Sequence, residues 1–527
     1  MPYYEEVIQQ ILTKKIQTKQ DLHSLKLKLC KKYNLKKIPS DSEILAYISD
    51  TFLDDDETIL SLLRKKSTRT LSGVAVVAVM TSPEHCPHGR CVPCPGGPTH
   101  ETPQSYTGHE PAALRAINHH FDPYIQARSR LDQLKSIGHP VDKIDLIIMG
   151  GTFTARTPWY QEWFVKECYD ALNNKHSRSL YRAQKNNEHA LSRCIGLTLE
   201  TRPDWFRMQH ADHALRFGAT RIELGVQHID DSILYRIHRG HTVHDIISAT
   251  RLAKETGFKV CYHIMPGLPG SNSKKDLEAF KKLFTDERFQ PDMLKIYPVL
   301  VIQGTQLYDQ WTKKEYEPLT VEKAAVLIAK MKQFIPPWVR IQRIQRDIPA
   351  QLISAGITKS NLRQYVLEEL QKHGKTCKCI RCREIGFASL RKKIEITNIR
   401  LDTIRTEYSA SGGKEFFLSL EDSSHDVIVG YLRLRDVVSS HRLELNRDSC
   451  MIIRELKILG RELSLGDRAN AAWQHRGLGK RLISEAESIC KDEFGRSLLF
   501  VLSGVGVKPY YRKLGFADNG PFLCKKL

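Results

Sequence analysis

The chain has 527 residues, of which 41% are hydrophobic and 27% charged, and it carries a net charge of +20. At about 100 to 200 residues per domain this length predicts two to four folded domains, and the positive charge favours a polyanionic partner such as nucleic acid over a surface kept basic for solubility. No apolar run reaches the ~20 residues that span a bilayer and residues 1–10 lack a signal-peptide segment, so we expect a cytoplasmic protein without a membrane partner.

Residues 1–68 are predicted to form a basic helical segment. Nine lysines lie between positions 14 and 37, and Asp21 is the single acidic residue in that stretch. Leucines at positions 22, 25, 27 and 29 give the segment an apolar side that can pack. A lysine-rich helix can be only a solvated face, but this density of lysine favours contact with phosphate groups.

Residues 69–330 alternate short β-branched runs with longer helical segments. The predicted strands are residues 74–80, 144–149, 194–200, 221–226, 259–265 and 293–300. Six strands with helices between them predict an α/β domain with a parallel sheet, as an open or closed barrel. Chemistry in such folds gathers where the strands end. Short motifs follow the strands there: GGTF (150–153), ETRP (200–203), GVQ (225–227) and PGLPG (266–270).

Three cysteines follow the first predicted strand, namely Cys86, Cys91 and Cys94 in SPEHCPHGRCVPCPGG. They could belong to a zinc site, which usually has four ligands, or be three unremarkable thiols. They could also hold a 4Fe-4S cluster, which three cysteines would leave with one open iron for a substrate-like molecule. Six of the 13 cysteines fall in two tight clusters, and this uneven distribution indicates metal sites and a reducing compartment rather than a disulfide framework.

The second cysteine cluster lies in a basic linker, residues 331–391. Cys377, Cys379 and Cys382 form a CxCxxC motif that favours a structural zinc ion, with His373 or solvent as the candidate fourth ligand. Arg340, Arg343 and Arg346 recur at a spacing of three, and they are either surface charge or a second basic region.

Residues 392–527 change to alternating strands, with candidates at 416–420 and 427–434. A QxxGxG pattern at 474–479 precedes an amphipathic helix, and the backbone N–H groups at such a helix start can bind a pyrophosphate. The same pattern can be a plain turn into a helix. The neighbouring strand-like run IIRELKILG (452–460) and the pair Tyr510 and Tyr511 favour a ligand site.

The motifs, taken together, resemble the catalytic subunit family of Elongator over nearly the whole chain. In the first part these are GVAVVAVM, CPGGPTHETPQSYTGHEPAALRAI, IMGGTF, LTLETRPD, ELGVQ, RGHT, KIYPVLVIQGT and QRDIP. In the last part they are RELKILG, QHRGLGKRL and SGVGVKPYYRKLGF. The resemblance implies a radical S-adenosylmethionine domain, a partial (βα)6 TIM-like barrel, followed by an α+β GNAT acetyltransferase-like domain at 392–527. The CxxxxCxxC spacing departs from the commoner CxxxCxxC, and the Elongator branch shares the longer gap.

The resemblance also implies an activity. Family members attach a carboxymethyl-type group to C5 of the wobble uridine, position 34, in the anticodon stem-loop of tRNA. Their cofactors are a 4Fe-4S cluster, here on Cys86, Cys91 and Cys94, and S-adenosylmethionine, with acetyl-CoA as co-substrate and an external electron donor. A radical is needed because neither an acetyl methyl group nor uridine C5 is reactive enough for acid–base catalysis. The length resembles an archaeal single-chain form that is expected to work without other Elongator subunits.

Site residues follow from the same resemblance. Tyr510, Tyr511 and Glu455 are the expected catalytic residues. The zinc ion remains assigned to Cys377, Cys379 and Cys382 by the CxCxxC spacing. Lys143, in the radical domain, matches a position that contacts acetyl-CoA. The expected cofactor-binding residues are Lys143, Gly150, Gly151, Glu200, Glu455, Leu456, Lys457, Ile458, Gln474, Arg476, Gly477, Leu478, Gly479, Lys480 and Tyr511.

Two other functions compete with this one. A protein lysine acetyltransferase with a structural iron-sulfur domain would need a general base, for which Glu455 is the candidate. A non-catalytic tRNA-binding platform would explain the charge but not the intact cysteine and glycine motifs. We therefore expect a tRNA-modifying enzyme.

Overall fold

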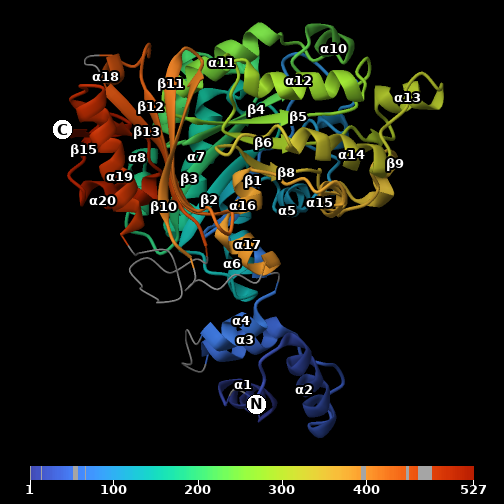
Figure 1. Cartoon of the computed structure of the whole chain (residues 1–527). Helices are drawn as coiled ribbons and strands as arrows, with labels where there is room; N and C mark the ends of the chain where they lie inside the picture. The colour runs from blue at the N-terminus through green and yellow to red at the C-terminus, as the bar shows by residue number, and fades with distance from the viewer. Residues whose placement is uncertain are drawn as a thin grey trace.

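The structure is a computed structural model that describes residues 2–13, 15–50, 57–65, 67–392, 399–446, 450–460 and 477–527. Figure 1 shows a helical N-terminal module set apart from two α/β regions that pack side by side. None of the helices in these ranges combines the length and the apolar character needed to cross a membrane.

A seven-stranded parallel sheet forms the larger region. Its order is β1-β2-β3-β4-β5-β6-β8, so β1 and β8 are its two edges and the sheet does not close between them. The parallel α/β prediction is confirmed. The strands are β1 (Ala75–Met80), β2 (Lys143–Met149), β3 (Arg193–Thr201), β4 (Arg221–Gln227), β5 (Lys259–Ile264), β6 (Met293–Ile296) and β8 (Arg340–Arg343).

Strand β8 was not among the predicted strands. Its sequence RIQR lacks the apolar pattern of a buried strand. In the structure Arg340 is nevertheless buried, and its Nη1 atom forms an ion pair with Glu384 Oε2 at 2.8 Å. A buried arginine is tolerated when a carboxylate neutralises it, and this pairing cannot be seen in local sequence.

Most of the helices between consecutive strands cover the outer face of the sheet, and their apolar sides join the strands in one large core (Figure 1). Two helices differ: α5 borders the cavity inside the sheet, and the buried apolar residues of α5 and α13 belong to smaller separate clusters. Most of the helices begin at a residue whose side chain caps the first turn, such as Thr157, Thr242 and Asn272. The helices are α5 (Pro111–Asn118), α6 (Pro123–Ser136), α7 (Pro158–Asn173), α8 (Leu180–Asn187), α9 (Met208–Arg216), α10 (Asp231–Arg236), α11 (Val243–Glu255), α12 (Ser273–Thr285), α13 (Gln306–Thr312) and α14 (Val321–Lys332).

The segment between the two α/β regions is partly regular. Strand β9 (Ile353–Ala355) pairs antiparallel with β7 (Val301–Ile302), and three helices follow. These are α15 (Leu362–Lys372), α16 (Ile380–Arg383) and α17 (Ile385–Lys392). The CxCxxC motif spans the start of α16, and this helix contacts both β8 of the parallel sheet and β12 of the C-terminal region.

A second seven-stranded sheet forms the C-terminal region, in the order β10-β11-β12-β13-β14-β16-β15. Only the β13–β14 pair is parallel, and α19 packs on one face, as expected for an α+β domain. The elements are β10 (Asp402–Ala410), β11 (Gly413–Asp422), β12 (Val427–Asp436), α18 (Leu443–Asn446), β13 (Cys450–Ile458), α19 (Leu478–Ser488), β14 (Leu498–Val501), α20 (Lys508–Arg512), β15 (Ala517–Asn519) and β16 (Phe522–Lys526).

The N-terminal module has its own apolar core, built from α1 (Pro2–Leu12), α2 (Lys19–Lys32), α3 (Asp41–Asp50) and α4 (Glu57–Leu63). It contacts the larger region at the end of α6, where Arg64 Nε donates a hydrogen bond to Gly138 O over 2.6 Å. Not every lysine of its basic segment is available to phosphate. Lys26 is buried with Nζ 2.7 Å from Asp41 Oδ1, and Lys32 Nζ lies 2.7 Å from Glu6 Oε2.

A buried ion cluster joins the two sheets. Arg454 on β13 places Nη2 2.7 Å from Asp292 Oδ1, just before β6, and 2.7 Å from Glu415 Oε2 on β11. Lys254 at the end of α11 lies 3.5 Å from both carboxylates, and Arg435 completes the neutralisation of Glu415 at 3.0 Å. All five side chains are fully buried, so removing one of them leaves an uncompensated charge without water.

The glycines of the SGVGV segment let the two regions approach closely. A Cβ atom at Gly504 would collide with the carbonyl oxygen of Ile195 on β3, and one at Gly506 would lie 2.5 Å from Arg193 Cβ. These glycines therefore have a packing role at the junction of the two sheets.

We expect Arg454→Met to lower the free energy of unfolding by about 3 to 5 kcal/mol, because Asp292 and Glu415 would remain buried and ionised without their shared partner. Urea denaturation followed by circular dichroism measures the change. Lys414→Met, which breaks the more exposed Lys414–Glu407 pair, should cost less than about 1 kcal/mol. Equal losses in the two variants would contradict a special role for the buried cluster.

Candidate active site

One cavity of about 1290 Å³ runs along the inside of the parallel sheet and continues to the C-terminal region. Its lining includes Cys86, Cys91 and Cys94 at one end and Glu455 and Lys457 of β13 at the other. Cavities that hold one drug-sized ligand are usually about 300 to 1,000 Å³. This one therefore has room for more than one reactant.

The cysteine loop after β1 presents its three sulfurs to this cavity. The Sγ atoms of Cys86, Cys91 and Cys94 do not all lie within 4.8 Å of one another, in contrast to those of the CxCxxC motif. One zinc ion holds thiolates about 2.3 Å from the metal and so needs sulfurs closer together. The three sulfurs therefore do not form a preformed site for a single ion.

Polar groups approach all three sulfurs, and Thr152 Oγ1 lies 3.7 Å from Cys86 Sγ. His88 Nε2 lies 3.0 Å from Cys91 Sγ, and Arg239 Nη1 donates to the same sulfur over 3.6 Å. Cys94 Sγ accepts a hydrogen bond from Gln104 Nε2 at 3.4 Å. Hydrogen bonds to cluster sulfurs stabilise the more negative, reduced state of an iron-sulfur cluster. The donor set is thus suited to a cluster that accepts an electron.

Arg239 is held in place by neighbouring residues of the cavity wall. Its Nη2 donates to Gly225 O at 2.6 Å at the end of β4, and its own carbonyl accepts from Arg202 Nη1 at 2.8 Å. Gly240, with φ of 70°, brings the chain against His88, where a Cβ would lie 2.6 Å from His88 Cβ. Burial and the charges of Arg202 and Arg239 lower the pKa of His88 to about 3, so this ring is neutral.

The double glycine after β2 brings the backbone to the cysteine loop. Gly150 and Gly151 have φ of 122° and 91°, which only glycine adopts readily, and a Cβ at Gly150 would collide with Thr81 Oγ1. A Cβ at Gly151 would lie 4.0 Å from Cys86 Sγ. The motif therefore leaves space directly beside the cysteines, as a ligand of the open iron requires.

Glu200 lies at the end of β3 within a polar network that the sequence did not reveal. Its carboxylate accepts from Lys295 Nζ on β6 at 3.1 Å and from Tyr106 Oη at 3.1 Å. Lys295 also pairs with Glu223 on β4, which accepts from His263 Nε2 of β5 at 2.8 Å. All five side chains line the cavity. The sequence signal for this network was the presence of polar residues, Glu223 and His263, inside the otherwise apolar strands RIELGVQ and KVCYHI.

Strand β13 divides the predicted acetyl-CoA residues between its two faces. Glu455 and Lys457 line the cavity, whereas Leu456 and Ile458 pack toward the core beneath α19. Glu455 accepts from Arg433 Nε at 2.8 Å. Although burial opposes ionisation, Arg433 and Lys259 hold the pKa of Glu455 below its usual range. An ion-paired carboxylate of this kind is a weak base.

The start of α19 gathers most of the other predicted residues. Gly477 precedes the helix with φ of 80°, and Leu478, Gly479 and Lys480 form its first turn. A Cβ at Gly479 would lie 2.7 Å from Tyr510 Oη and 3.7 Å from Leu456 Cδ2, so α19, α20 and β13 meet there. Tyr511 is buried in the core of this region. Gln474 and Arg476 lie outside the described residues.

Lys143 does not line the cavity. It begins β2, at the opposite end of the strand from the cysteine loop, and pairs in register with Arg193 of β3. Because Arg193 contacts the Gly506 segment, Lys143 faces the side of the sheet that the C-terminal region covers. The structure therefore separates it from the cysteines and leaves it near the junction.

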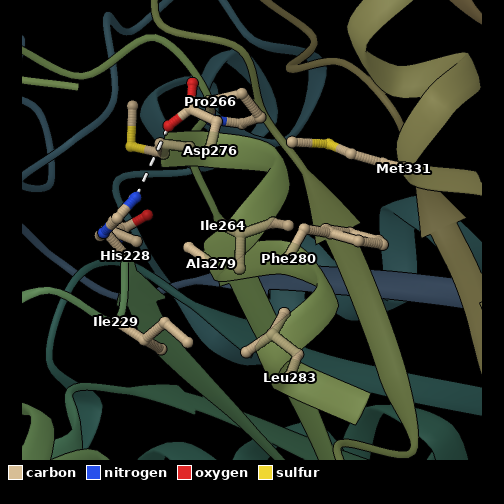
Figure 2. A pocket seen from close by; sticks show the side chains of 11 residues that line it. His228, Ile229, Ile264, Pro266, Asp276, Ala279, Phe280, Leu283 and Met331 are labelled. Carbon is tan, nitrogen blue, oxygen red and sulfur yellow. Dashed lines mark ion pairs between the residues drawn. The ribbon is translucent and has the colours of Figure 1, made fainter. Parts of the chain in front are cut away.

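A second, much smaller cavity of about 20 Å³ lies between the end of β5 and α12. Figure 2 shows His228 and Asp276 pointing toward one another at its rim, where Nε2 and Oδ1 are 3.5 Å apart. Apolar side chains such as Ile264, Phe280 and Leu283 form the rest of the wall. This volume holds about one water molecule, so it is not a substrate site.

Comparisons with known proteins agree with this geometry. Residues 80–283 match the Radical SAM superfamily, residues 291–372 the Radical_SAM C-terminal domain, and residues 1–71 the ELP3 N-terminal domain. Elongator complex protein 3 of Homo sapiens is 40% identical over 99% of this chain and 96% of its own length. The chain belongs to the Elongator complex protein 3 family. The resemblance of the motifs is thereby confirmed.

Two archaeal members of the Elongator complex protein 3 family are closer in sequence. A protein of Methanocaldococcus jannaschii named tRNA uridine(34) acetyltransferase is 50% identical over 93% of this chain and 90% of its own length. The solved structure of Methanocaldococcus infernus Elp3 with an N-terminal deletion (1–46) has a TM-score of 0.78 and 46% identity, and the match covers 87% of this chain and all of that one. The open parallel sheet followed by a mixed C-terminal sheet is therefore an architecture that this chain shares with the archaeal Elp3.

The CxCxxC motif of this family member forms a separate site. The Sγ atoms of Cys377, Cys379 and Cys382 lie within 4.8 Å of one another, close enough to share one ion. Lys332 Nζ, fully buried, donates to Cys382 Sγ at 3.4 Å. Although burial opposes ionisation of Cys379, hydrogen bonds from the other two thiols and the charge of Lys332 hold its pKa well below the usual range. His373 is exposed and pairs instead with Glu369, its Nε2 3.0 Å from Oε1.

We expect Arg239→Gln to lower the midpoint potential of the reconstituted cluster, because the variant loses the positive charge and weakens the donor that stabilise the reduced state at Cys91. A tenfold shift in the ratio of oxidised to reduced cluster corresponds to 59 mV for one electron. Redox titration with electron paramagnetic resonance detection measures the midpoint potential of each variant. Arg207→Gln, which removes an arginine that does not line the cavity, is the control. An unchanged potential with full iron content would contradict the assignment.

Proposed function

We propose that this chain is a cytoplasmic tRNA-modifying enzyme that installs a carboxymethyl-type group at C5 of the wobble uridine, position 34. It uses S-adenosylmethionine radical chemistry with acetyl-CoA as the source of the added carbons. The names of its archaeal relatives support the substrate, and membership of the radical-type family supports the chemistry. We divide the chain into residues 1–68, 69–330, 331–391 and 392–527, with β8 extending the sheet into the third part.

The observation that carries this proposal is the single cavity that joins the cysteine loop to β13. A radical formed beside the cysteines can act on a group bound near β13 only if both reactants share one space shielded from water. The cavity lining includes Cys91 and Gly151 from one region and Glu455 and Lys457 from the other. A non-catalytic platform would not need such a shared space.

Residues near the cysteine loop would hold the radical cofactors. When bound, a 4Fe-4S cluster and S-adenosylmethionine supply a 5′-deoxyadenosyl radical able to take hydrogen from an acetyl methyl group. Cys86, Cys91 and Cys94 would ligate the cluster, while the open backbone at Gly150 and Gly151 leaves room for the second cofactor. Glu200, fixed by Lys295 and Tyr106, offers a carboxylate to polar groups of that cofactor.

Residues of the C-terminal region would hold acetyl-CoA. The free N–H groups in the first turn of α19, from Leu478 to Lys480, suit the pyrophosphate. Strand β13 pairs with β14 only as far as Ile453, so Glu455–Ile458 extend beyond the pairing and can run alongside the pantetheine. Tyr510 would position the thioester at this start of α19, and the buried Tyr511 would support it. Lys143 would reach the coenzyme from the radical-type sheet.

Protein lysine acetylation is disfavoured by the state of Glu455. A general base for that reaction must accept a proton from an ammonium group, but Arg433 and Lys259 hold the pKa of Glu455 below its usual range. The net charge of +20 and the arginine-rich cavity also suit a polyanionic substrate better than a protein tail.

The direct test incubates anaerobically reconstituted protein with tRNA, acetyl-CoA, S-adenosylmethionine and a strong reductant. Mass spectrometry of the digested nucleosides should show carboxymethyluridine, and the small-molecule fraction should contain 5′-deoxyadenosine. Formation of neither product would reject the proposed function.

Cys91→Ala should abolish 5′-deoxyadenosine formation while tRNA affinity, measured by filter binding, stays within about twofold of the original. The reason is that Cys91 would ligate the cluster but not contact the RNA. Cys30→Ser, which changes a cysteine of the N-terminal module, should leave both measurements unchanged. Loss of RNA binding together with the radical product in Cys91→Ala would show that the cluster is mainly structural.

We further propose that Cys377, Cys379 and Cys382 bind a structural zinc ion, whose negative thiolate shell the buried Lys332 neutralises. Cys379→Ser should remove about one zinc per chain, measured by inductively coupled plasma mass spectrometry, and lower the melting temperature. Cys168→Ser, at another buried cysteine, should keep the zinc. Iron in place of zinc at this site would contradict the assignment.

A further inference from the structure

Three arginines gather where the cavity opens at the edge of the parallel sheet. Arg69 lies in the short helical turn before β1, Arg115 on α5 and Arg130 on α6, and all three line the cavity. Val76 and Ala78 of the edge strand β1 lie in the same wall. The positive charges are thus grouped on one side of the opening, with the cysteine loop further along the same cavity.

None of these three arginines is neutralised by a carboxylate within the described part of the chain. Arg130 Nη1 donates to the neutral amide oxygen of Gln133 at 2.6 Å, and Arg115 Nη2 donates to Ala78 O at 2.6 Å. The Nε group of Arg115 is buried without a hydrogen-bond partner. Burial, followed by the charges of Arg115 and Arg69, lowers the pKa of Arg130 to about 10. Three cations held together in this way favour a bound anion.

Other arginines of the cavity lining differ from these three. Arg340 and Arg381 both pair with Glu384, with N–O distances of 2.8 Å, and Arg343 pairs with Asp347. Arg239 and Arg346 have no carboxylate partner in the described part of the chain, but each donates singly to a backbone carbonyl, of Gly225 and Ser105. Arg69, Arg115 and Arg130 instead form a group of three charges, close enough that Arg115 and Arg69 lower the pKa of Arg130. Their grouped charge is therefore available to a ligand.

We propose that Arg69, Arg115 and Arg130 form a binding site for one phosphodiester group of single-stranded RNA beside the nucleoside that enters the cavity. The inference rests on the proposed function and adds the contact that holds the backbone. Guanidinium groups match phosphate oxygens in pairs of hydrogen bonds, as lysines do not. A base that reaches an enclosed cavity must leave its stack, which costs a few kcal/mol, and a phosphate contact at the opening offsets this cost.

The test measures binding of a fluorescein-labelled anticodon stem-loop RNA to the full chain by anisotropy at several salt concentrations. Arg130→Gln should weaken binding about tenfold, the value of one charge-assisted contact, and lower the slope of log K against log salt by about 0.7. Arg128→Gln is the matched control on the same helix, because Arg128 does not line the cavity and pairs with Asp132 at 2.9 Å. It should leave the slope unchanged.

A second measurement identifies the phosphate. Stem-loops with one uncharged methylphosphonate at each loop position in turn should reveal one position where the substitution weakens binding to the original protein but not to Arg130→Gln. No such coupled position would overturn the inference. Arg69→Gln, at an exposed side chain that does not support the fold, should reproduce the coupling at the same position.

Coenzyme phosphates are the alternative source of the anion. Calorimetric titration with acetyl-CoA should give the same affinity for Arg130→Gln and the original protein. Weaker acetyl-CoA binding with an unchanged RNA slope would overturn the assignment to RNA. If the original protein shows no salt-dependent RNA binding, the proposed function itself fails. If it binds RNA and Arg130→Gln behaves as Arg128→Gln does, only this inference fails.

Discussion

The buried ion cluster around Arg454 is the interaction on which the shared cavity depends. Asp292 belongs to the parallel sheet and Glu415 to the C-terminal sheet, and one guanidinium lies 2.7 Å from both. Desolvated charges of this kind require their partners in place, so the two sheets have one well-defined relative position. The glycines at 504 and 506 allow the close backbone approach that the same position demands. Without this fixed junction, Glu455 and Cys91 would not border one space.

That junction gives each region a distinct task. The parallel sheet ends in glycine-rich loops and carries its polar groups inward, so a reactive species formed there is surrounded by fixed hydrogen-bond partners such as Lys295 and Glu223. The C-terminal sheet offers a helix start and the end of β13 that extends beyond its pairing with β14, which suit a long phosphorylated coenzyme. The cavity reaches the exposed Val76 on the edge strand β1, and arginines without carboxylate partners near β1 give this end of the cavity a positive charge.

Much of the fold could be read from local patterns. The strands β1 to β6 are apolar runs bounded by turns. The cysteine loop follows β1, the double glycine follows β2, and Glu200 lies near the end of β3. These groups come together because the strand ends share one edge of the parallel sheet. Strand β8 escaped prediction because Arg340 is made compatible with the core by Glu384, 44 residues further along the chain. Lys26 and Lys32 resemble phosphate ligands in sequence, yet carboxylates brought near by folding occupy them.

The sequence by itself determined the chemistry that this protein can carry: the cysteine spacings, the glycine motifs and the excess of positive charge are properties of residue type and order. Only the tertiary structure decided how those groups combine. It showed that the sulfurs of Cys377, Cys379 and Cys382 lie close enough to share one ion, and that Glu455 is ion-paired. It also separated arginines with carboxylate partners from those without. The physical reason is that desolvation and charge pairing depend on neighbours in space, and most of those neighbours are distant in sequence.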